Sequence, residues 1–229
     1  MIQSIFSNKL VIVILTARSG DLARTLSAAL PGSEIHGKIG RIQNADKFFQ
    51  NTVEHIRCLF EAGRPIIGIC ATGILIRAVG ASLNDKRTEP PIIAISENGR
   101  SVVPLLGGHH GANKLATHLS NLIGAHPAIT TAGDTVFGIA LDDPPSGWKI
   151  ANPEKAKFFM AELLIGEKIN LEIEAGNPMW LTDSEAPFSP NGSISIKVTE
   201  KIVNPGEDAL IFHPPVFALG IGCERNTDA

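Results

Sequence analysis

Apolar runs of strand length alternate with helical stripes along the chain as far as residue 123. The β-branched run in "KLVIVIL" ends at a polar turn, which is typical of a buried strand. Four further strands are predicted in the stretches "PGSEIHG", "GRPIIGIC", "PPIIAIS" and "RSVVPLL". Apolar residues at helical spacing predict helices at 21–30, 42–60, 73–82 and 112–123, the third of them capped by Thr72.

This alternation predicts a mostly parallel sheet with helices on both faces. In such sheets, ligands bind in the loops that follow the carboxyl ends of the strands. The rule selects the loops Thr16–Asp21, Cys70–Gly73 and Gly107–Asn113, and we expect the last two to lie side by side. A hairpin-type turn is predicted at "ENG", between the fourth and fifth strands.

The pattern changes after "TTAGDT". Breaks rich in proline and glycine surround a predicted helix at 153–165 and predicted strands near 169–174, 193–199 and 209–213. The expected fold class is therefore α/β, with a parallel-sheet N-terminal domain and a second, smaller α+β domain. The tail "VFALGIGC" predicts a fresh strand that would open another domain, so the chain can be part of something longer.

Composition narrows the class of protein. Of 229 residues, 44% are hydrophobic and 19% charged, and the formal net charge of −3 argues against a general nucleic-acid surface. The apolar run Leu10–Leu15 is too short to span a bilayer. The cysteines, Cys58, Cys70 and Cys223, lack zinc-site spacing, which favours reduced thiols in a cytoplasmic protein without a metal site.

The stretch "GGHHGAN" is the strongest candidate for chemistry. Its glycines, Gly107 and Gly108 among them, let the backbone approach a ligand closely. His109 and His110 are suited to proton transfer near neutral pH, and Asn113 can bind a ligand or cap the helix that follows. The alternative is a glycine turn whose histidines are merely exposed.

Three other stretches can hold an anionic ligand. Thr72 and Gly73 stand where a strand runs into a helix, and Arg77 follows within that helix. Lys86 and Arg87 are adjacent cations, and the arginine offers a bidentate fork. "ITTAGDT" supplies the hydroxyls of Thr130 and Thr131. Each stretch also has an ordinary interpretation, as a tight turn, a solvated loop or a cap.

Together these stretches resemble the family of the cobalamin biosynthesis protein CbiG. The resemblance is carried by "LTARSGDLARTLSAALPGSEIH", by the blocks "ICATGILIRAVG", "LNDKRTEPP", "LLGGHHGAN" and "TTAGDT", and by the closing "LGIGC". It divides the chain into a CbiG-like N-terminal α/β domain (1–134), a middle domain (135–215) and the start of a truncated C-terminal domain (216–229). In some relatives these domains precede a precorrin-3B C17-methyltransferase.

The resemblance implies hydrolytic opening of the δ-lactone of cobalt-precorrin-5A with release of acetaldehyde. His109 and His110 would be catalytic; the substrate would bind to Thr72, Gly73, Arg77, Lys86, Arg87, Gly107, Gly108, Asn113, Thr130 and Thr131. The expected partners are the tetrapyrrole intermediate and other corrin-pathway enzymes or a fused methyltransferase, but no nucleic acid or membrane. No cofactor is expected, since any cobalt arrives in the substrate.

Two other functions stay open from the sequence. One is a non-catalytic corrinoid-binding module that serves a fused methyltransferase, because the Gly-His loop here is one residue shorter than the usual family pattern. The other is an unrelated nucleotide- or sugar-phosphate-binding α/β enzyme, although no glycine-rich fingerprint of such enzymes is present.

Overall fold

The computed structural model describes residues 9–86, 88–108, 111–203, 206 and 208–216. The chain divides into two compact units, Met1–Thr131 and Ala132–Ala229. Each unit has its own sheet and its own hydrophobic core. The expected α/β class with a smaller second unit is confirmed.

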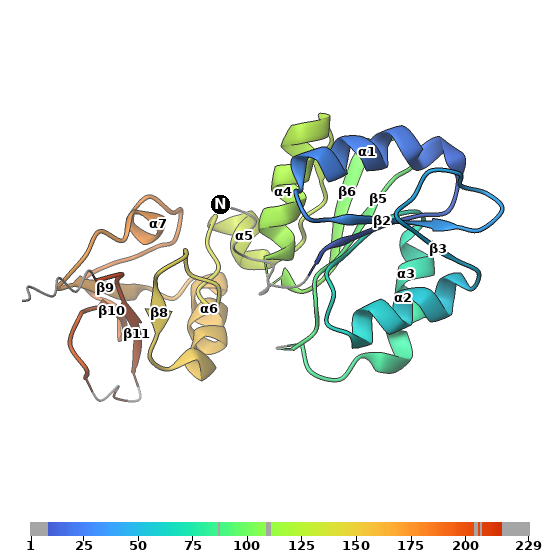
Figure 1. Cartoon of the computed structure of the whole chain (residues 1–229). Helices are drawn as coiled ribbons and strands as arrows, with labels where there is room; N and C mark the ends of the chain where they lie inside the picture. Colours follow the sequence, from blue (N-terminus) through green and yellow to red (C-terminus); the bar gives the residue numbers. More distant parts are fainter. Residues whose placement is uncertain (1–8, 87, 109–110, 204–205, 207, 217–229) are drawn as a thin grey trace, which may run out of the picture. The chain divides into compact units, whose positions relative to one another are not determined.

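Among the described residues, unit 1 contains a seven-stranded sheet in the order β3-β2-β1-β4-β5-β6-β7 (Figure 1). Its strands are β1 (Val11–Ile14), β2 (Glu34–Lys38), β3 (Lys47–Phe49), β4 (Ile66–Ile69), β5 (Ile92–Ile95), β6 (Ser101–Leu106) and β7 (His126–Pro127). The strands from β3 to β5 run parallel to one another. β6 runs antiparallel to β5, and β7 runs parallel to β6.

Helices cover both faces of this sheet (Figure 1). They are α1 (Gly20–Ala29), α2 (Thr52–Glu61), α3 (Thr72–Val79) and α4 (Ala112–Ile123), with 3-10 turns at Ala17–Ser19 and Gly80–Ser82. Ile12 and Ile14 of β1 pack with α1 and α4, whereas Val11 and Val13 pack with α2 and α3. Successive side chains of a strand point to opposite faces of the sheet, so a strand whose two faces are both covered by helices is apolar at every position.

The direction of β6 corrects one expectation. Two parallel strands need a crossover of a dozen or more residues, but β5 and β6 are joined by a tight turn in which Gly99 has φ +67°. β6 is therefore antiparallel, and the loop after it lies at the opposite edge of the sheet from the loop after β4.

The predicted helix at 42–60 is also wrong in its first half. Phe48 is 47% exposed and the adjacent Phe49 is 5% exposed, as in a strand whose successive side chains point to opposite faces. These residues belong to β3, and α2 begins only after Asn51, whose side chain accepts a hydrogen bond from the Glu54 N–H at 3.2 Å. Thr72, predicted as a cap, is instead the first residue of α3; Ala71 occupies the cap position.

Unit 2 has a four-stranded sheet in the order β8-β11-β10-β9 within the described residues. The strands are β8 (Lys149–Ile150), β9 (Ile169–Ile173), β10 (Ile194–Val198) and β11 (Ala209–His213); the helices are α5 (Ala132–Val136), α6 (Ala156–Leu164) and α7 (Met179–Thr182), with a 3-10 turn at Pro153–Lys155. Buried Phe159 and Phe212 occupy the centre of its core. The predicted strand in "VFALGIGC" and the proposed domain at 216–229 fall, except for Val216, outside the described residues.

No helix in the described part of the chain is long and apolar enough to cross a membrane. The prediction of three CbiG-like domains remains a prediction, since the division seen here is only into the two units, after Thr131.

Candidate functional site

Three of the predicted loops meet at the amino edge of the parallel strands in unit 1. The loop 84–91 enters β5 at this edge, the loop Gly107–Asn113 leaves antiparallel β6 here, and the segment after β7 arrives here because β7 runs parallel to β6. We call these loops, with Lys86, Gly107, Gly108, Asn113 and Thr131, the amino-edge cluster. The sheet order therefore brings together residues of different segments that lie 18 to 45 positions apart in the sequence.

Close backbone contacts hold the cluster together. Gly107 has φ +76°, and a Cβ at this position would lie 2.7 Å from the Pro91 Cα, so only glycine fits against the loop that enters β5. The Asn113 side-chain amide donates a hydrogen bond to Thr131 Oγ1 at 2.6 Å, which ties the start of α4 to the segment after β7. Thr130, next in the chain, is exposed.

The residues on both sides of His109 and His110, Gly108 and Gly111, are described by the structure. The Ala112 N–H donates to the Gly107 carbonyl at 3.0 Å, and the Gly111 N–H donates to the Gly108 carbonyl at 3.3 Å. These two bonds join residues on either side of positions 109 and 110. His109 and His110, like Arg87, lie outside the residues that the structure describes. The catalytic role predicted for the two histidines and the binding role predicted for Arg87 stay predictions.

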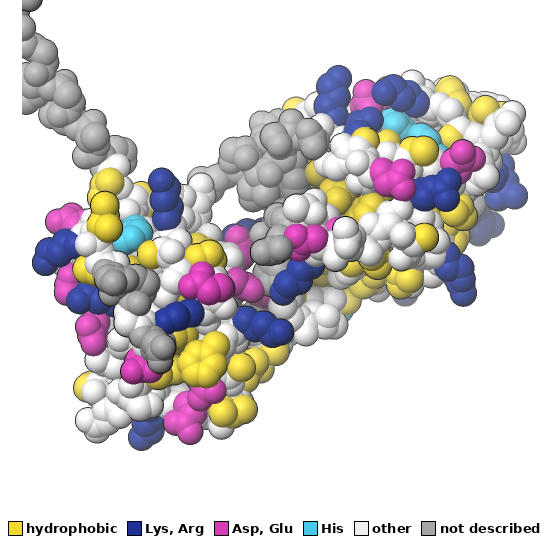
Figure 2. All heavy atoms as spheres, turned by 90° about the horizontal axis from the view of Figure 1, so that it is seen from below, with side chains coloured by type: hydrophobic (Ala, Val, Ile, Leu, Met, Phe, Trp, Pro, Cys, Tyr) yellow, Lys and Arg dark blue, Asp and Glu magenta, His cyan; other side chains and the backbone are white. Residues whose placement is uncertain are grey.

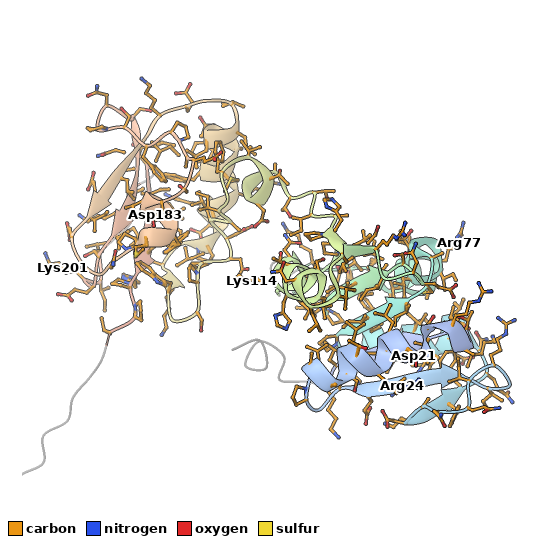
Figure 3. All side chains as sticks on the ribbon, turned by 90° about the horizontal axis from the view of Figure 1, so that it is seen from above. Asp21, Arg24, Arg77, Lys114, Asp183 and Lys201 are labelled. Carbon is orange, nitrogen blue, oxygen red and sulfur yellow. The ribbon has the colours of Figure 1, made fainter. Side chains whose placement is uncertain are left out.

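Lys86 extends the cluster with a cation. Its side chain is exposed, on a loop that is closed by hydrogen bonds from the Thr88 and Glu89 N–H groups to the Asp85 carbonyl. Lys114, in the first turn of α4, is a second exposed cation beside this edge (Figure 3), and the sequence interpretation missed it. The signal was available, since the residue follows Asn113 directly.

Thr72, Gly73 and Arg77 are at the other end of the strands. They belong to α3, which begins just after the carboxyl end of β4, about 13 Å of strand away from the amino edge. The Arg77 guanidinium donates to the Gly73 carbonyl at 3.1 Å and so folds back along its own helix (Figure 3). The expectation that Cys70–Gly73 and Gly107–Asn113 lie side by side is therefore wrong, because β6 reverses the chain.

A crevice of about 580 Å³ opens at this carboxyl edge. It lies where β1, β4 and β5 end, and the residues that line it are Leu15, Thr16, Arg41, Cys70, Ala71, Thr72, Ile74, Ala94, Ser96, Glu97, Ser101 and Val103. We call it the carboxyl-edge crevice. Most of these residues were not predicted as site residues, because they come from separate loops that share no motif.

Two features set the charge inside the crevice. Thr16 Oγ1 donates to a Glu97 carboxylate oxygen at 2.8 Å, which links the end of β1 to the β5–β6 turn. Burial, helped by the nearby Glu97 carboxylate, raises the pKa of the Cys70 thiol to about 11. Cys70 is therefore neutral at physiological pH and a poor nucleophile.

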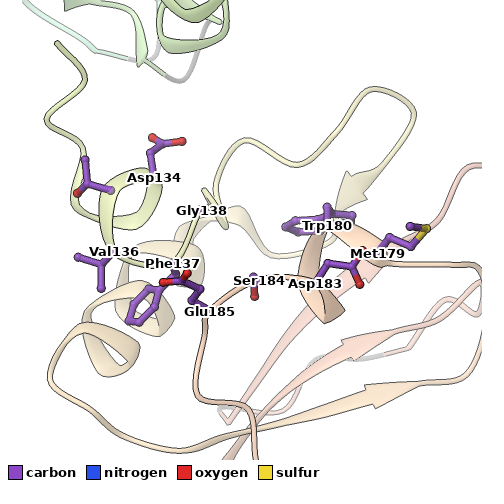
Figure 4. A pocket seen from close by; sticks show the side chains of 10 residues that line it. Asp134, Val136, Phe137, Gly138, Met179, Trp180, Asp183, Ser184 and Glu185 are labelled. Carbon is purple, nitrogen blue, oxygen red and sulfur yellow. The ribbon is translucent and has the colours of Figure 1, made fainter. Parts of the chain in front are cut away.

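Unit 2 has a hollow of its own, of about 600 Å³, between α5 and the segment that starts with α7 (Figure 4). Asp134, Asp183 and Glu185 contribute carboxylates to its lining, beside the apolar surfaces of Met179 and Trp180. This lining does not suit a ligand that carries several carboxylates, because like charges would repel. On the face of the molecule in Figure 2, by contrast, cationic and anionic side chains are interspersed and neither sign gathers.

No group of three or more His, Cys, Asp or Glu side chains in the described part of the chain is placed to hold a metal ion.

Part of unit 1 is similar to a known protein family. Residues 54–134 match the family described as cobalamin synthesis G N-terminal, and this range holds the whole amino-edge cluster. Over these 81 of the 229 residues, the chain is similar to a CbiG N-terminal domain.

Two curated proteins that are similar to this chain bear the same name. A cobalt-precorrin-5A hydrolase from Priestia megaterium is 26% identical over 246 aligned positions, which cover 95% of this chain and 66% of that protein. A cobalt-precorrin-5A hydrolase from Salmonella typhimurium (strain LT2) is 37% identical over 122 residues, which cover 53% of this chain and 35% of that protein. The chain thus spans less than two thirds of either relative.

A solved structure is also similar, that of a cobalamin biosynthesis protein G homolog from Sulfolobus solfataricus. It matches with a TM-score of 0.45 and 20% identity, over 93% of this chain and 63% of the other.

Proposed function

We propose that this chain acts in corrin-ring biosynthesis, by opening the δ-lactone of cobalt-precorrin-5A and releasing acetaldehyde. The observation that carries the proposal is that the amino-edge cluster lies entirely within the residues that match the CbiG N-terminal family. Both relatives named above are cobalt-precorrin-5A hydrolases, which supports the same activity here.

The chemistry assigned to the cluster has two steps. A water oxygen attacks the lactone carbonyl carbon and gives up a proton, the single bond between that carbon and the ring oxygen breaks, and a proton passes to the departing ring oxygen. The freed alcohol then loses its proton as it becomes the carbonyl of acetaldehyde, and the electron pair of the broken carbon–carbon bond enters the macrocycle. One imidazole, that of His109 with His110 as the less favoured candidate, serves both proton transfers.

The remaining roles are binding roles. Lys86 and Arg87 pair with substrate carboxylates, and Asn113, Thr130 and Thr131 offer hydrogen bonds at the glycine-lined loop of Gly107 and Gly108. The cobalt is part of the substrate. Thr72, Gly73 and Arg77 were predicted to bind the same ligand, but their position at the opposite edge favours assigning them to a different one.

The setting of the activity is part of the proposal. We propose that the protein works in the cytoplasm, where its two described cysteines, Cys58 and Cys70, are free thiols. Its partners there are the tetrapyrrole intermediate and the corrin-pathway enzymes that precede and follow it, a fused methyltransferase included.

Incubation of the protein with the lactone-bearing intermediate, with acetaldehyde as the readout, tests the proposal. His109→Ala should slow acetaldehyde release by about 10²–10⁴-fold, the range of a positioned general acid or base, and His110→Ala should do much less. His126→Ala is the matched control, since His126 is exposed on β7. If both His109→Ala and His110→Ala release acetaldehyde at the wild-type rate, the two histidines are only turn residues.

The same experiment distinguishes the hydrolase from the alternative function, a corrinoid-binding module. If the wild-type protein binds the intermediate but releases no acetaldehyde, the chain is a corrinoid-binding module and the hydrolase proposal fails.

A further inference from the structure

The carboxyl-edge crevice lies at the switch point of the sheet. From β1 the chain goes to β2 through α1 on one face, whereas α2 and α3, which flank β4 in the chain, pack on the other face. Connections that leave neighbouring strands on opposite faces open a crevice beyond their carboxyl ends, and this is where open α/β sheets bind ligands. Its volume of about 580 Å³ falls in the range of small-molecule sites.

The crevice is lined partly by apolar side chains and partly by polar ones. Leu15, Ile74, Ala94 and Val103 give it an apolar surface. Arg41, Thr72 and Ser101 line the same space, and none of the three side chains has a hydrogen-bond or ion-pair partner among the residues that the structure describes. A guanidinium and two hydroxyls thus converge on one cavity from β2, β4 and β6 without satisfying one another.

The other polar groups of the crevice are already engaged. The Ser96 hydroxyl donates to Asn98 at 2.7 Å and accepts from the backbone N–H groups of Arg100 and Ser101. Glu97 accepts the hydroxyl of Thr16, and the Cys70 thiol stays protonated. The groups that remain available are mainly donors, namely the Arg41 guanidinium and the hydroxyls, with the first N–H groups of α3 beside them; the Glu97 carboxylate is the exception.

We propose that the carboxyl-edge crevice is a second ligand site, which takes a small carboxylate with a short apolar body. The carboxylate is held by Arg41 with Thr72 and Ser101, and the apolar part lies on the floor formed by Leu15, Ala94 and Val103. The ligand is not the macrocycle bound at the amino-edge cluster, because about 13 Å of strand separates the two edges.

A titration of the whole chain with butyrate tests this, followed by the methyl resonances of Leu15, Ala94 and Val103. We expect saturable shifts of these methyl groups with butyrate and none with n-butylamine, which has the same apolar body and the opposite charge. Arg41→Gln should weaken butyrate binding by about tenfold, as expected for loss of a charge-assisted hydrogen bond. Thr72→Val should weaken it less, since a neutral hydrogen bond is lost.

Arg57→Gln is the control, because Arg57 is on α2 and does not line the crevice. Equal responses to butyrate and n-butylamine, or an unchanged titration in Arg41→Gln, would overturn the proposal. The readout is binding without turnover, so its failure leaves the hydrolase proposal untouched, and failure of acetaldehyde release leaves this one untouched.

Discussion

A buried histidine, His36, and a half-buried one, His55, hold one edge of unit 1 together. His36 on β2 is 1% exposed, with Nδ1 2.9 Å from Nε2 of His55 on α2 and Nε2 3.3 Å from a Glu34 carboxylate oxygen. The carboxylate accepts, so His36 Nε2 carries the proton, His36 Nδ1 accepts, and His55 Nε2 donates. His55 also stacks on Phe49 of β3, with ring centroids 4.4 Å apart.

The charges around the pair oppose further protonation. Arg64 donates a hydrogen bond to the Glu34 carboxylate at 2.6 Å, and Lys47 donates another to it at 3.3 Å. These contacts lower the Glu34 pKa to about 2, although burial by itself would raise it. Burial lowers the pKa of His36, and burial with the neighbouring His36 lowers that of His55 to about 4. A second proton on His36, at Nδ1, would also place its N–H group against the Nε2–H group of His55.

The first prediction concerns pH. Because both histidines have lowered pKa values in the folded state, stability is fully present above 6.5, the ordinary value, and is lost as the pH falls toward about 4. Glu34 does not contribute between pH 7 and 5, since its own loss occurs as the pH falls from 4.5 to about 2. Urea unfolding at pH 7 and pH 5 should show lower stability at pH 5.

His55→Gln, which cannot titrate at this position, should reduce that dependence to the part that comes from His36, and His126→Gln, an exposed control on β7, should retain it in full. A variant at position 55 with the wild-type pH dependence would refute the prediction.

At the scale of elements, the boundary between β3 and α2 is set by one side chain. Asn51 has extended backbone angles, φ −98° and ψ 111°, and its side chain accepts the hydrogen bond from the Glu54 N–H. That bond satisfies one of the donors that a helix start leaves without a partner. The apolar stripe from Ile42 to Phe60 concealed this start, because strand and helix residues share similar spacing over a short window.

The second prediction follows from that cap. Asn51→Ala should lower the free energy of unfolding by about 1 kcal/mol, measured by urea titration, because the Glu54 N–H loses its acceptor. Asn51→Asp keeps an acceptor oxygen at the cap and should be close to wild type. Equal destabilisation by alanine and aspartate would mean that capping does not set the start of α2.

The elements also explain how much of the site could be predicted. The helix at 112–123 and the strand at 209–213 agree with their sequence patterns residue for residue, because strong periodicity fixes such elements. The choice of loops stays a prediction, whereas their predicted arrangement is wrong: the "ENG" turn already implied an antiparallel β6, which puts the loop after it at the amino edge. Arg41, Thr72 and Ser101 meet only through strand order, which no local motif records.

At the scale of the whole molecule, the two units bury separate cores. Leu26 is fully buried between α1 and the sheet of unit 1, and Phe212 is fully buried in unit 2. The protein's two tryptophans, Trp148 and Trp180, are both in unit 2, and Trp180 packs edge-on against Phe212 with ring centroids 5.1 Å apart. Tryptophan fluorescence therefore reports on unit 2, whereas circular dichroism reports on both units.

The last prediction uses this asymmetry. Leu26→Ala should destabilise unit 1 by about 2–5 kcal/mol and shift the unfolding midpoint seen by circular dichroism, while the fluorescence midpoint stays near wild type. Phe212→Ala should instead lower the fluorescence midpoint, with a loss of about 3–5 kcal/mol, because a large buried ring is removed from beside Trp180. If Leu26→Ala moves both midpoints equally, the two cores unfold as one cooperative unit and the prediction fails.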